Sequence, residues 1–253
     1  MSITPRYSRD GVTLYQGDCL RIMPQLQANS YDAIVTDPPY SSGGLHRTDR
    51  VVEASRKYLE KNAATIGKVP TFDGDNRDQR SYLLWTTLWM SDALRVAKDG
   101  AVIIVFSDWR QVPTVSDALQ VAGWVWRGML VWDKVHTRPQ PGRFTQTCEF
   151  MLWGSKGPLP LDRHAPVLPS VYRHGSARNE ERVHVTSKPI SLMKELMRIV
   201  EPNGCVLDPF AGGGGTIVAC QSLGIPVTGI EYVSEYVDVA IKRLGQLRLG
   251  LDA

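Results

Sequence analysis

Cys205-Val206-Leu207-Asp208-Pro209-Phe210-Ala211-Gly212-Gly213-Gly214-Gly215-Thr216 is the stretch of sequence that decides the fold. An apolar strand runs straight into four glycines, and apolar residues from Thr216 to Leu223 continue with helical spacing. Such a strand–loop–helix turn brings the backbone close to a ligand and points helix N–H groups at it. The alternative, a flexible surface loop, is disfavoured by the apolar elements on both sides. We therefore expect a binding loop for a nucleotide-like cofactor.

Residues around this loop distinguish between two such cofactors. The dinucleotide fingerprint G-x-G-x-x-G requires a third glycine where Ile217 stands. Glu231, at the end of the next expected strand, can accept hydrogen bonds from the ribose hydroxyls of NAD or of S-adenosylmethionine. Asp208 would repel a pyrophosphate, but it can bind the charged amino group of a methionine moiety. The loop favours S-adenosylmethionine, and an NAD-dependent oxidoreductase is the alternative.

A second motif, Asp37-Pro38-Pro39-Tyr40, ends the apolar run that precedes it. The exocyclic amine of adenine or cytosine is a poor nucleophile, because its lone pair is delocalised into the ring. Asp37 and a backbone carbonyl fixed by the two prolines can hold both N–H bonds and orient that lone pair. Tyr40 offers a flat face on which an extruded base can stack. The motif predicts a catalytic site for methylation of a base amine, and its plainer interpretation is an Asp-Pro turn followed by a core tyrosine.

The rest of the chain alternates strand and helix patterns, which indicates an α/β fold with a mostly parallel sheet and helices on both faces. We expect strands over 13–16, 31–36, 101–106, 205–208 and 226–231, an antiparallel pair over 124–132 and 149–153, and helices over 20–26, 82–97, 111–122, 189–200, 216–223 and 234–249. Residues 41–80, with a helix near 51–62, and residues 154–185 lack clear periodicity. The sequence therefore predicts one domain over 1–253 with two variable regions.

The distribution of charge indicates which kind of partner the chain could bind. The net charge of +3 gives no overall argument for nucleic acid, but the stretch from Lys134 to Arg182 is locally basic. This suits a phosphate-facing surface, with a solvated loop as the alternative. The candidate DNA-binding residues are Lys134, Arg138, Arg143, Arg173 and Arg178.

The four cysteines are scattered, with no ligand spacing to histidines, so we expect neither a metal site nor disulfides. No apolar run is long enough to span a membrane, and residues 1–6 lack the apolar core of a signal peptide. These features favour a cytoplasmic protein.

At these motifs the chain resembles the DNA amino-methyltransferases, specifically their β-class, in which the catalytic motif precedes the cofactor motif. The resemblance covers nearly the whole chain. It includes Asp37 to Tyr40, Gly17-Asp18-Cys19, Trp132-Asp133-Lys134, the segment from Glu149 to Lys156, Thr186-Ser187-Lys188-Pro189, the loop with Phe210, and Glu231-Tyr232. Where the family often has His-Pro-Thr-Gln-Lys-Pro, this chain has His184-Val185-Thr186-Ser187-Lys188-Pro189, which leaves the contacts around Lys188 open.

The resemblance implies a Rossmann-like methyltransferase fold with circularly permuted motif order, and a double-stranded DNA substrate. An aspartate at the first catalytic position usually accompanies adenine N6 targets, so we expect a sequence-specific adenine N6-methyltransferase, with cytosine N4 as the alternative. Target recognition is expected within residues 157–185, and a homodimer is expected because members of this family often form dimers. The implied cofactor-binding residues are Asp18, Cys19, Lys188, Asp208, Phe210, Ala211, Gly212, Gly214, Thr216, Glu231 and Tyr232.

Three other functions compete with this interpretation. Methyltransferases that act on RNA or on a protein amide carry a related motif, but in the opposite motif order. The NAD-dependent oxidoreductase would be distinguished by cofactor binding. A DNA-binding regulator with a dead active site would be distinguished by methyl incorporation.

Overall fold

A computed structural model of the 253-residue chain describes residues 3–41, 77–135, 141–175 and 188–248. In chain order its elements are β1 (Tyr7–Arg9), β2 (Val12–Gln16), α1 (Cys19–Ile22), the 3₁₀ helix η1 (Met23–Gln25), β3 (Tyr31–Thr36), α3 (Gln79–Val96), β4 (Ala97–Ser107), α4 (Val112–Val121), β5 (Val125–Asp133), β6 (Cys148–Ser155), β7 (Val171–Arg173), α5 (Ile190–Met197), β8 (Val206–Asp208), α6 (Gly215–Ser222), β9 (Val227–Glu231) and α7 (Ser234–Arg248). The helix expected near residues 51–62 and most of the variable region 41–80 lie outside the described residues.

The strands form one sheet in the order β1-β2-β9-β8-β3-β4-β6-β5-β7. The five central strands from β2 to β4 run parallel, as the alternation of strand and helix patterns predicts. Strands β5 and β6 pair antiparallel with each other, and β6 also pairs antiparallel with β4. The expected mostly parallel sheet and the expected antiparallel pair are both confirmed.

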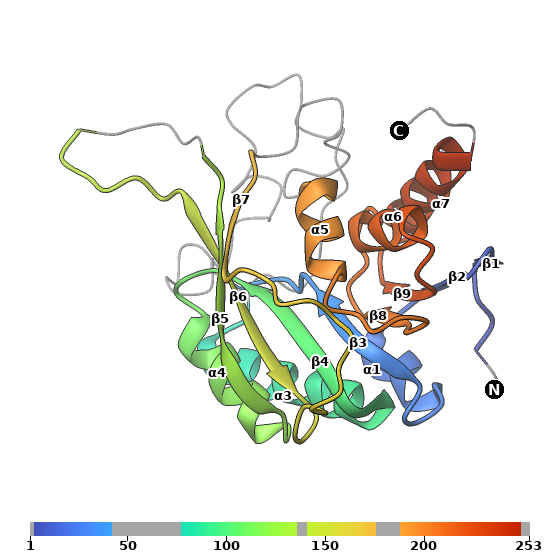
Figure 1. Cartoon of the computed structure of the whole chain (residues 1–253), viewed down its shortest axis with the longest axis horizontal. Helices are drawn as coiled ribbons and strands as arrows, with labels where there is room; N and C mark the ends of the chain where they lie inside the picture. The colour runs from blue at the N-terminus through green and yellow to red at the C-terminus, as the bar shows by residue number, and fades with distance from the viewer. Residues whose placement is uncertain (1–2, 42–76, 136–140, 176–187, 249–253) are drawn as a thin grey trace.

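Helices cover both faces of the sheet (Figure 1). Alternate residues of β3 point to opposite faces: Ala33 and Val35 pack with α5, α6 and α7, whereas Ile34 packs with α1, α3 and α4. Both faces of a parallel strand are therefore apolar, which explains why the run in β3 shows no polar alternation. No helix in the described part of the chain is long and apolar enough to cross a membrane.

Three details differ from the sequence-based expectations. Residues 98–100, which separate the expected helix over 82–97 from the expected strand over 101–106, instead form a bulge inside β4, which begins at Ala97. Gly100 has a φ of +76° there, and the Lys98 ammonium pairs with Asp32 on β3 at 2.8 Å. The sequence analysis also missed β1 and β7, because three residues are too few to establish a period.

The order of the strands determines where the two motifs meet. Strand β3, which ends before Asp37, lies next to β8, which ends at Asp208. Strand β9 lies on the other side of β8 and ends at Glu231. Because parallel strands finish at the same edge of a sheet, motifs far apart in the chain share one carboxyl-terminal edge, where open α/β sheets bind their ligands.

Candidate active site

The catalytic motif begins at the carboxyl end of β3, where Asp37 follows the buried Thr36. Both oxygens of the Asp37 carboxylate have partners: Lys188 Nζ lies 2.6 Å from Oδ2, and the Tyr40 hydroxyl donates to Oδ1. Lys188 Nζ also lies 2.9 Å from the Tyr40 oxygen. The motif therefore folds back on itself and meets a lysine that stands just before α5.

Lys188 belongs to a row of alternating charges. Its ammonium lies 3.3 Å from Glu149 Oε2, and Glu149 Oε1 lies 2.7 Å from Lys134 Nζ. The Lys188 side chain is only 6% exposed, and its ammonium sits 5.1 Å from the centre of the Phe106 ring. Two carboxylates and two ammonium groups thus balance in a largely buried cluster, as buried charges require.

The charge row changes the acidity of its members. Burial raises the pKa of Asp37, and the Lys188 ammonium opposes this rise. For Glu149, burial favours the protonated form, but the ammonium groups of Lys188 and Lys134 outweigh it and lower the pKa. Burial lowers the pKa of Lys188, but Asp37 and Glu149 outweigh it, so the pKa is raised and the lysine stays charged. Burial and the nearby carboxylates raise the pKa of Tyr40 well above its usual range, which keeps its hydroxyl a donor.

The cofactor loop starts at Asp208, whose side chain is almost fully buried. Its Oδ1 accepts a hydrogen bond from the Thr36 hydroxyl at 2.7 Å and another from the Phe210 N–H at 3.1 Å. Burial raises the pKa of Asp208 to about 6, against hydrogen bonds from Thr216, Thr36 and Phe210 that lower it. The Thr36 bond ties the residue just before Asp37, the predicted catalytic aspartate, directly to the acid of the cofactor loop.

The glycines give this loop its shape. Gly214 has a φ of +84° and precedes α6, and a Cβ on it would lie 2.9 Å from the Cβ of Ala240 on α7. Gly212 also has a positive φ, of +50°. A Cβ on Gly212 or Gly215 would meet no atom of the described residues within 4 Å, so this side of the loop is open. The loop therefore combines close packing against α7 with a bare backbone facing outward.

Glu231 fixes the neighbouring strand end. Its two carboxylate oxygens accept the N–H groups of Gly212 and Val233 at 2.8 and 2.7 Å. Burial raises its pKa. Each oxygen keeps a second lone pair that a ligand hydroxyl can use. The following Tyr232 is 63% exposed.

The predicted segment after β2 lies at the same edge. The Gly17 N–H donates to the Glu231 carbonyl at 2.8 Å, and the Asp18 side chain caps α1 by accepting from the Leu20 N–H at 3.0 Å. Cys19, by contrast, points into the core, where burial raises its pKa far above the usual range. The structure brings Asp18 to the cofactor edge, while the Cys19 thiol faces away into the packed interior.

An aromatic cluster lies beside the loop. Phe210 packs against Trp85 and Trp89 of α3, with ring centres 5.3 and 5.2 Å apart. Arg77 lies over the Trp85 ring at 4.4 Å. Ala211 and Thr216 are buried at the base of the same turn. The predicted cofactor loop is thus anchored on α3 as well as on the sheet.

The predicted DNA-binding residues separate in the structure. Lys134 pairs with Glu149 in the charge row. Arg173 on β7 pairs with Asp133 at 3.1 Å and is 72% exposed, and Arg143 is exposed. The remaining two, Arg138 and Arg178, lie outside the described residues.

Sequence reasoning missed three members of this site: Thr36, Phe106 and Glu149. Thr36 and Phe106 look like ordinary strand residues, so nothing in the local sequence marks them. Glu149 carried a signal, since it is the one acid in the apolar strand Cys148–Ser155. A buried strand with a single carboxylate calls for a partner of opposite charge.

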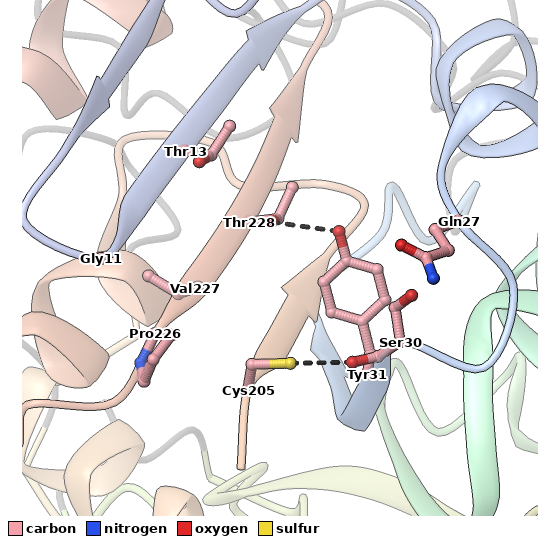
Figure 2. Close-up of a pocket in the computed structure, with 9 residues that line it drawn as sticks. All are labelled: Gly11, Thr13, Gln27, Ser30, Tyr31, Cys205, Pro226, Val227 and Thr228. Atoms are coloured by element: carbon pink, nitrogen blue, oxygen red, sulfur yellow. Dashed lines mark hydrogen bonds between the residues drawn. The ribbon is translucent and has the colours of Figure 1, made fainter. Parts of the chain in front are cut away.

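The opposite edge of the sheet has a different character. Figure 2 shows a hollow at the amino ends of β2, β9, β8 and β3. Tyr31 donates to Thr228 at 3.1 Å, and the Cys205 thiol donates to the Ser30 carbonyl at 3.0 Å. None of the residues that line this hollow is charged. The acids and ammonium groups of the candidate site gather at the carboxyl edge instead.

Comparisons with known proteins show the family to which the chain is similar. The family model N6_N4_Mtase, described as DNA methylase, matches residues 31–242. The chain is 31% identical over 237 residues to YubD of Escherichia coli (strain K12), a protein named as a methylase, and the alignment covers 93% of this chain and 88% of that protein.

Two solved structures share the fold. The M1.HpyAVI–SAM complex has a TM-score of 0.67 at 24% identity, covering 92% of this chain and 98% of that one. PvuII DNA methyltransferase (cytosine-N4-specific) has a TM-score of 0.71 at 16% identity, covering 95% and 89%. The predicted fold class is confirmed by these likenesses.

Proposed function

This chain belongs to the DNA methylase family, and we propose that it transfers a methyl group from S-adenosylmethionine to the N6 amine of adenine in double-stranded DNA. The observation that carries the proposal is the 2.7 Å hydrogen bond from Thr36 to Asp208. It fixes the residue before Asp37 to the acid of the cofactor loop, so that a target held by one motif meets a methyl donor held by the other.

The residues of the loop fit S-adenosylmethionine. The buried carboxylate of Asp208 suits the donor's amino group, and Glu231 keeps lone pairs for the ribose hydroxyls. The open side of Gly212 and Gly215 leaves room for a ligand against the backbone. When bound, S-adenosylmethionine supplies the methyl group, which passes to the amine as the methyl–sulfur bond breaks and leaves its electron pair on sulfur. The M1.HpyAVI structure, titled as a complex with SAM, supports the same choice.

The residues of the catalytic motif hold and activate the amine. Asp37 accepts one N–H bond, and the carbonyl at Pro38 accepts the other, with Pro39 fixing the backbone. Tyr40 provides the stacking face for the extruded base. After transfer the nitrogen carries a positive charge and two hydrogens, and it returns to neutrality by releasing one proton toward Asp37 and then to solvent. Orientation and electrostatic stabilisation supply the rate enhancement.

Two bases compete as the target. Asp37 as the first residue of the motif supports adenine N6, on the resemblance to the β-class enzymes. Cytosine N4 is the second candidate, because the fold is shared with a cytosine-N4-specific enzyme. We retain adenine because PvuII and this chain share only 16% identity, which carries the fold and not the choice of base.

The remaining parts of the proposal follow from the resemblance to the β-class enzymes. We propose that one methyltransferase domain spans the chain, that residues 157–185 contribute to target recognition, and that the enzyme works as a homodimer. Arg173 lies on β7 within that region with a 72% exposed side chain, and we assign it a phosphate contact. Arg143, between β5 and β6, is also exposed.

The test is nucleoside mass spectrometry on methyl-free DNA after incubation with the purified protein and S-adenosylmethionine. We expect N6-methyldeoxyadenosine from the wild type and none from Asp37→Ala. Asp238→Asn, which changes an exposed aspartate paired with Arg6, serves as the matched control and should remain active. N4-methyldeoxycytidine would move the assignment to cytosine, and the absence of both products would refute the proposal.

A further inference from the structure

Both oxygens of the Asp37 carboxylate already have hydrogen-bond partners in this structure. Asp37 gives Oδ2 to the Lys188 ammonium at 2.6 Å and Oδ1 to the Tyr40 hydroxyl. The proposed reaction needs Asp37 as the acceptor for the target amine. A strong cationic donor at 2.6 Å therefore holds the position that the substrate must take.

A second acceptor for this ammonium lies on its other side. Glu149 Oε2 is buried, accepts no well-directed hydrogen bond from the described residues, and lies 3.3 Å from Lys188 Nζ. Its partner oxygen Oε1 is held by Lys134 at 2.7 Å, so the Glu149 carboxylate is fixed in place. The lysine side chain is flexible enough to exchange one carboxylate for the other by a small rotation.

The chemistry favours such an exchange. The amine nitrogen becomes positively charged as it takes the methyl group, and a neighbouring ammonium would oppose that charge. An Asp37 carboxylate free of Lys188 would stabilise it instead. Removing the ammonium altogether would leave the partly buried Asp37 carboxylate without a cation and Glu149 with Lys134 as its one cation among the described residues, which is costly. Moving the ammonium toward Glu149 frees the Asp37 carboxylate and keeps a cation in the cluster.

We propose that Lys188 is a two-position cation. Its ammonium occupies Asp37 Oδ2 in the resting enzyme and moves onto Glu149 when the target amine binds. Glu149 is thereby a positioning residue for the reaction, acting through Lys188. The inference rests on the proposed function for its substrate. It also changes the role of Lys188 from a contact of the methionine moiety, as the family resemblance implies, to a partner of the catalytic carboxylate.

The two charges act on Asp37 with opposite signs. The groups that face its carboxylate are Lys188, Tyr40 and Glu149, with Asp208 behind it at the end of β8. Lys188 lowers the pKa of Asp37, and Glu149 raises it. Loss of Lys188 should therefore make Asp37 harder to ionise. Loss of the Glu149 charge should make it easier to ionise, because Lys188 then has only Asp37 to bind.

The experiment compares the wild type with Lys188→Met and Glu149→Gln, and uses Lys194→Met on α5 as the matched control. The pKa of Asp37 is read by carbon-13 NMR of aspartate-labelled protein, assigned with Asp37→Asn, in the absence of DNA. We expect the pKa to rise by about one unit or more in Lys188→Met, to fall in Glu149→Gln, and to stay unchanged in the control. Affinity for S-adenosylmethionine should stay at the wild-type level in all three.

Methyl-transfer kinetics provide the functional readout. The acid limb of the kcat/KM profile should move to higher pH in Lys188→Met and to lower pH in Glu149→Gln, with kcat/KM of the latter reduced about tenfold or more at its plateau. A merely structural role for Glu149 would lower activity without moving the limb. Glu149→Asp, which keeps the charge, should restore part of the loss.

Two failures remain distinguishable. A wild type that transfers no methyl group overturns the proposed function, while the NMR titration still reports on the two charges. A wild type that methylates DNA, with Asp37 titrating identically in all variants, overturns the two-position cation. Loss of S-adenosylmethionine binding in Lys188→Met without any change in the pKa of Asp37 also overturns the two-position cation. Lys188 would then be a cofactor-binding residue, as the family resemblance implies.

Discussion

Asp208→Asn should make the protein more stable and the cofactor site weaker. The wild-type carboxylate is 2% exposed, and burial raises its pKa from 3.8 to about 6. An asparagine keeps the shape and an acceptor oxygen for Thr36 and Phe210, and its amide can face the Thr216 hydroxyl. The substitution therefore removes a buried charge while leaving the local hydrogen bonds in place.

The magnitude follows from linkage between protonation and folding. A raised carboxylate pKa means that the folded state binds the proton more tightly than the unfolded state. Below pH 3.8 the carboxyl group is protonated in both states and costs no stability. As the pH rises from 3.8 through about 6 the free energy of unfolding falls, and above that it is lower by about 3 kcal/mol. Asparagine has no such penalty. The free energy of unfolding of the variant should therefore exceed that of the wild type by about 3 kcal/mol at pH 8, and the difference should shrink only as the pH falls through about 6 toward 4.

Urea denaturation of both proteins between pH 4 and pH 8 measures this difference. Asp238→Asn is the control, because its carboxylate is 61% exposed and its pairing with Arg6 contributes little. The same samples should show S-adenosylmethionine binding weakened by about 30-fold or more in Asp208→Asn, since a buried charge pair loses one partner. An Asp208→Asn protein that is less stable than the wild type at pH 8, or a difference that does not change with pH, would refute the reasoning.

Three further predictions concern the same loop. Affinity for S-adenosylmethionine, measured by calorimetry, should be about tenfold weaker at pH 5 than at pH 7, because Asp208 with a pKa of about 6 loses its charge in that interval; equal affinities would contradict this. Gly214→Ala should destabilise the protein by about 1–3 kcal/mol in thermal denaturation, since φ is +84° and the new Cβ would lie 2.9 Å from Ala240; Gly215→Ala, where the Cβ meets nothing within 4 Å, is the control and should change stability far less. Thr36→Val removes a donor to the Asp208 carboxylate and should move the pH dependence of cofactor binding to higher pH; an unmoved profile would mean that Thr36 does not tune this acid.

Strong periodic and chemical signals made much of the fold and site predictable. Strand β3 is observed over the predicted residues, because the apolar run Ala33-Ile34-Val35 shortly before an Asp-Pro pair is typical of a buried parallel strand. The glycine loop is similarly explicit, since the positive φ at Gly212 and Gly214 disfavours other residues there. The carboxyl ends of β3 and β8 could be expected near each other once both strands were taken as parallel.

What the sequence could not reveal depends on contacts between distant segments. The Lys188–Glu149 ion pair joins the start of α5 to β6, and neither residue has a neighbour in sequence that marks the pairing. Local charge predicts a DNA contact for Lys134, and its pairing with Glu149 could not be foreseen from that charge. Cys19 is predicted to bind the cofactor from its position in a motif, and the burial of its thiol in the core could not be foreseen from that motif. Side-chain direction and pairing across the sheet are tertiary properties, which local pattern does not carry.

The central claim is that Asp37 holds the target amine while the Asp208 loop holds the methyl donor. Single-turnover transfer of a labelled methyl group from S-adenosylmethionine to methyl-free DNA, measured together with donor affinity, tests it most directly in the wild type and in Asp37→Asn. The account predicts rapid transfer by the wild type, and a loss of about 100-fold or more in Asp37→Asn with donor affinity unchanged. Transfer at the wild-type rate by Asp37→Asn would contradict it, as would a loss of transfer explained entirely by loss of donor binding.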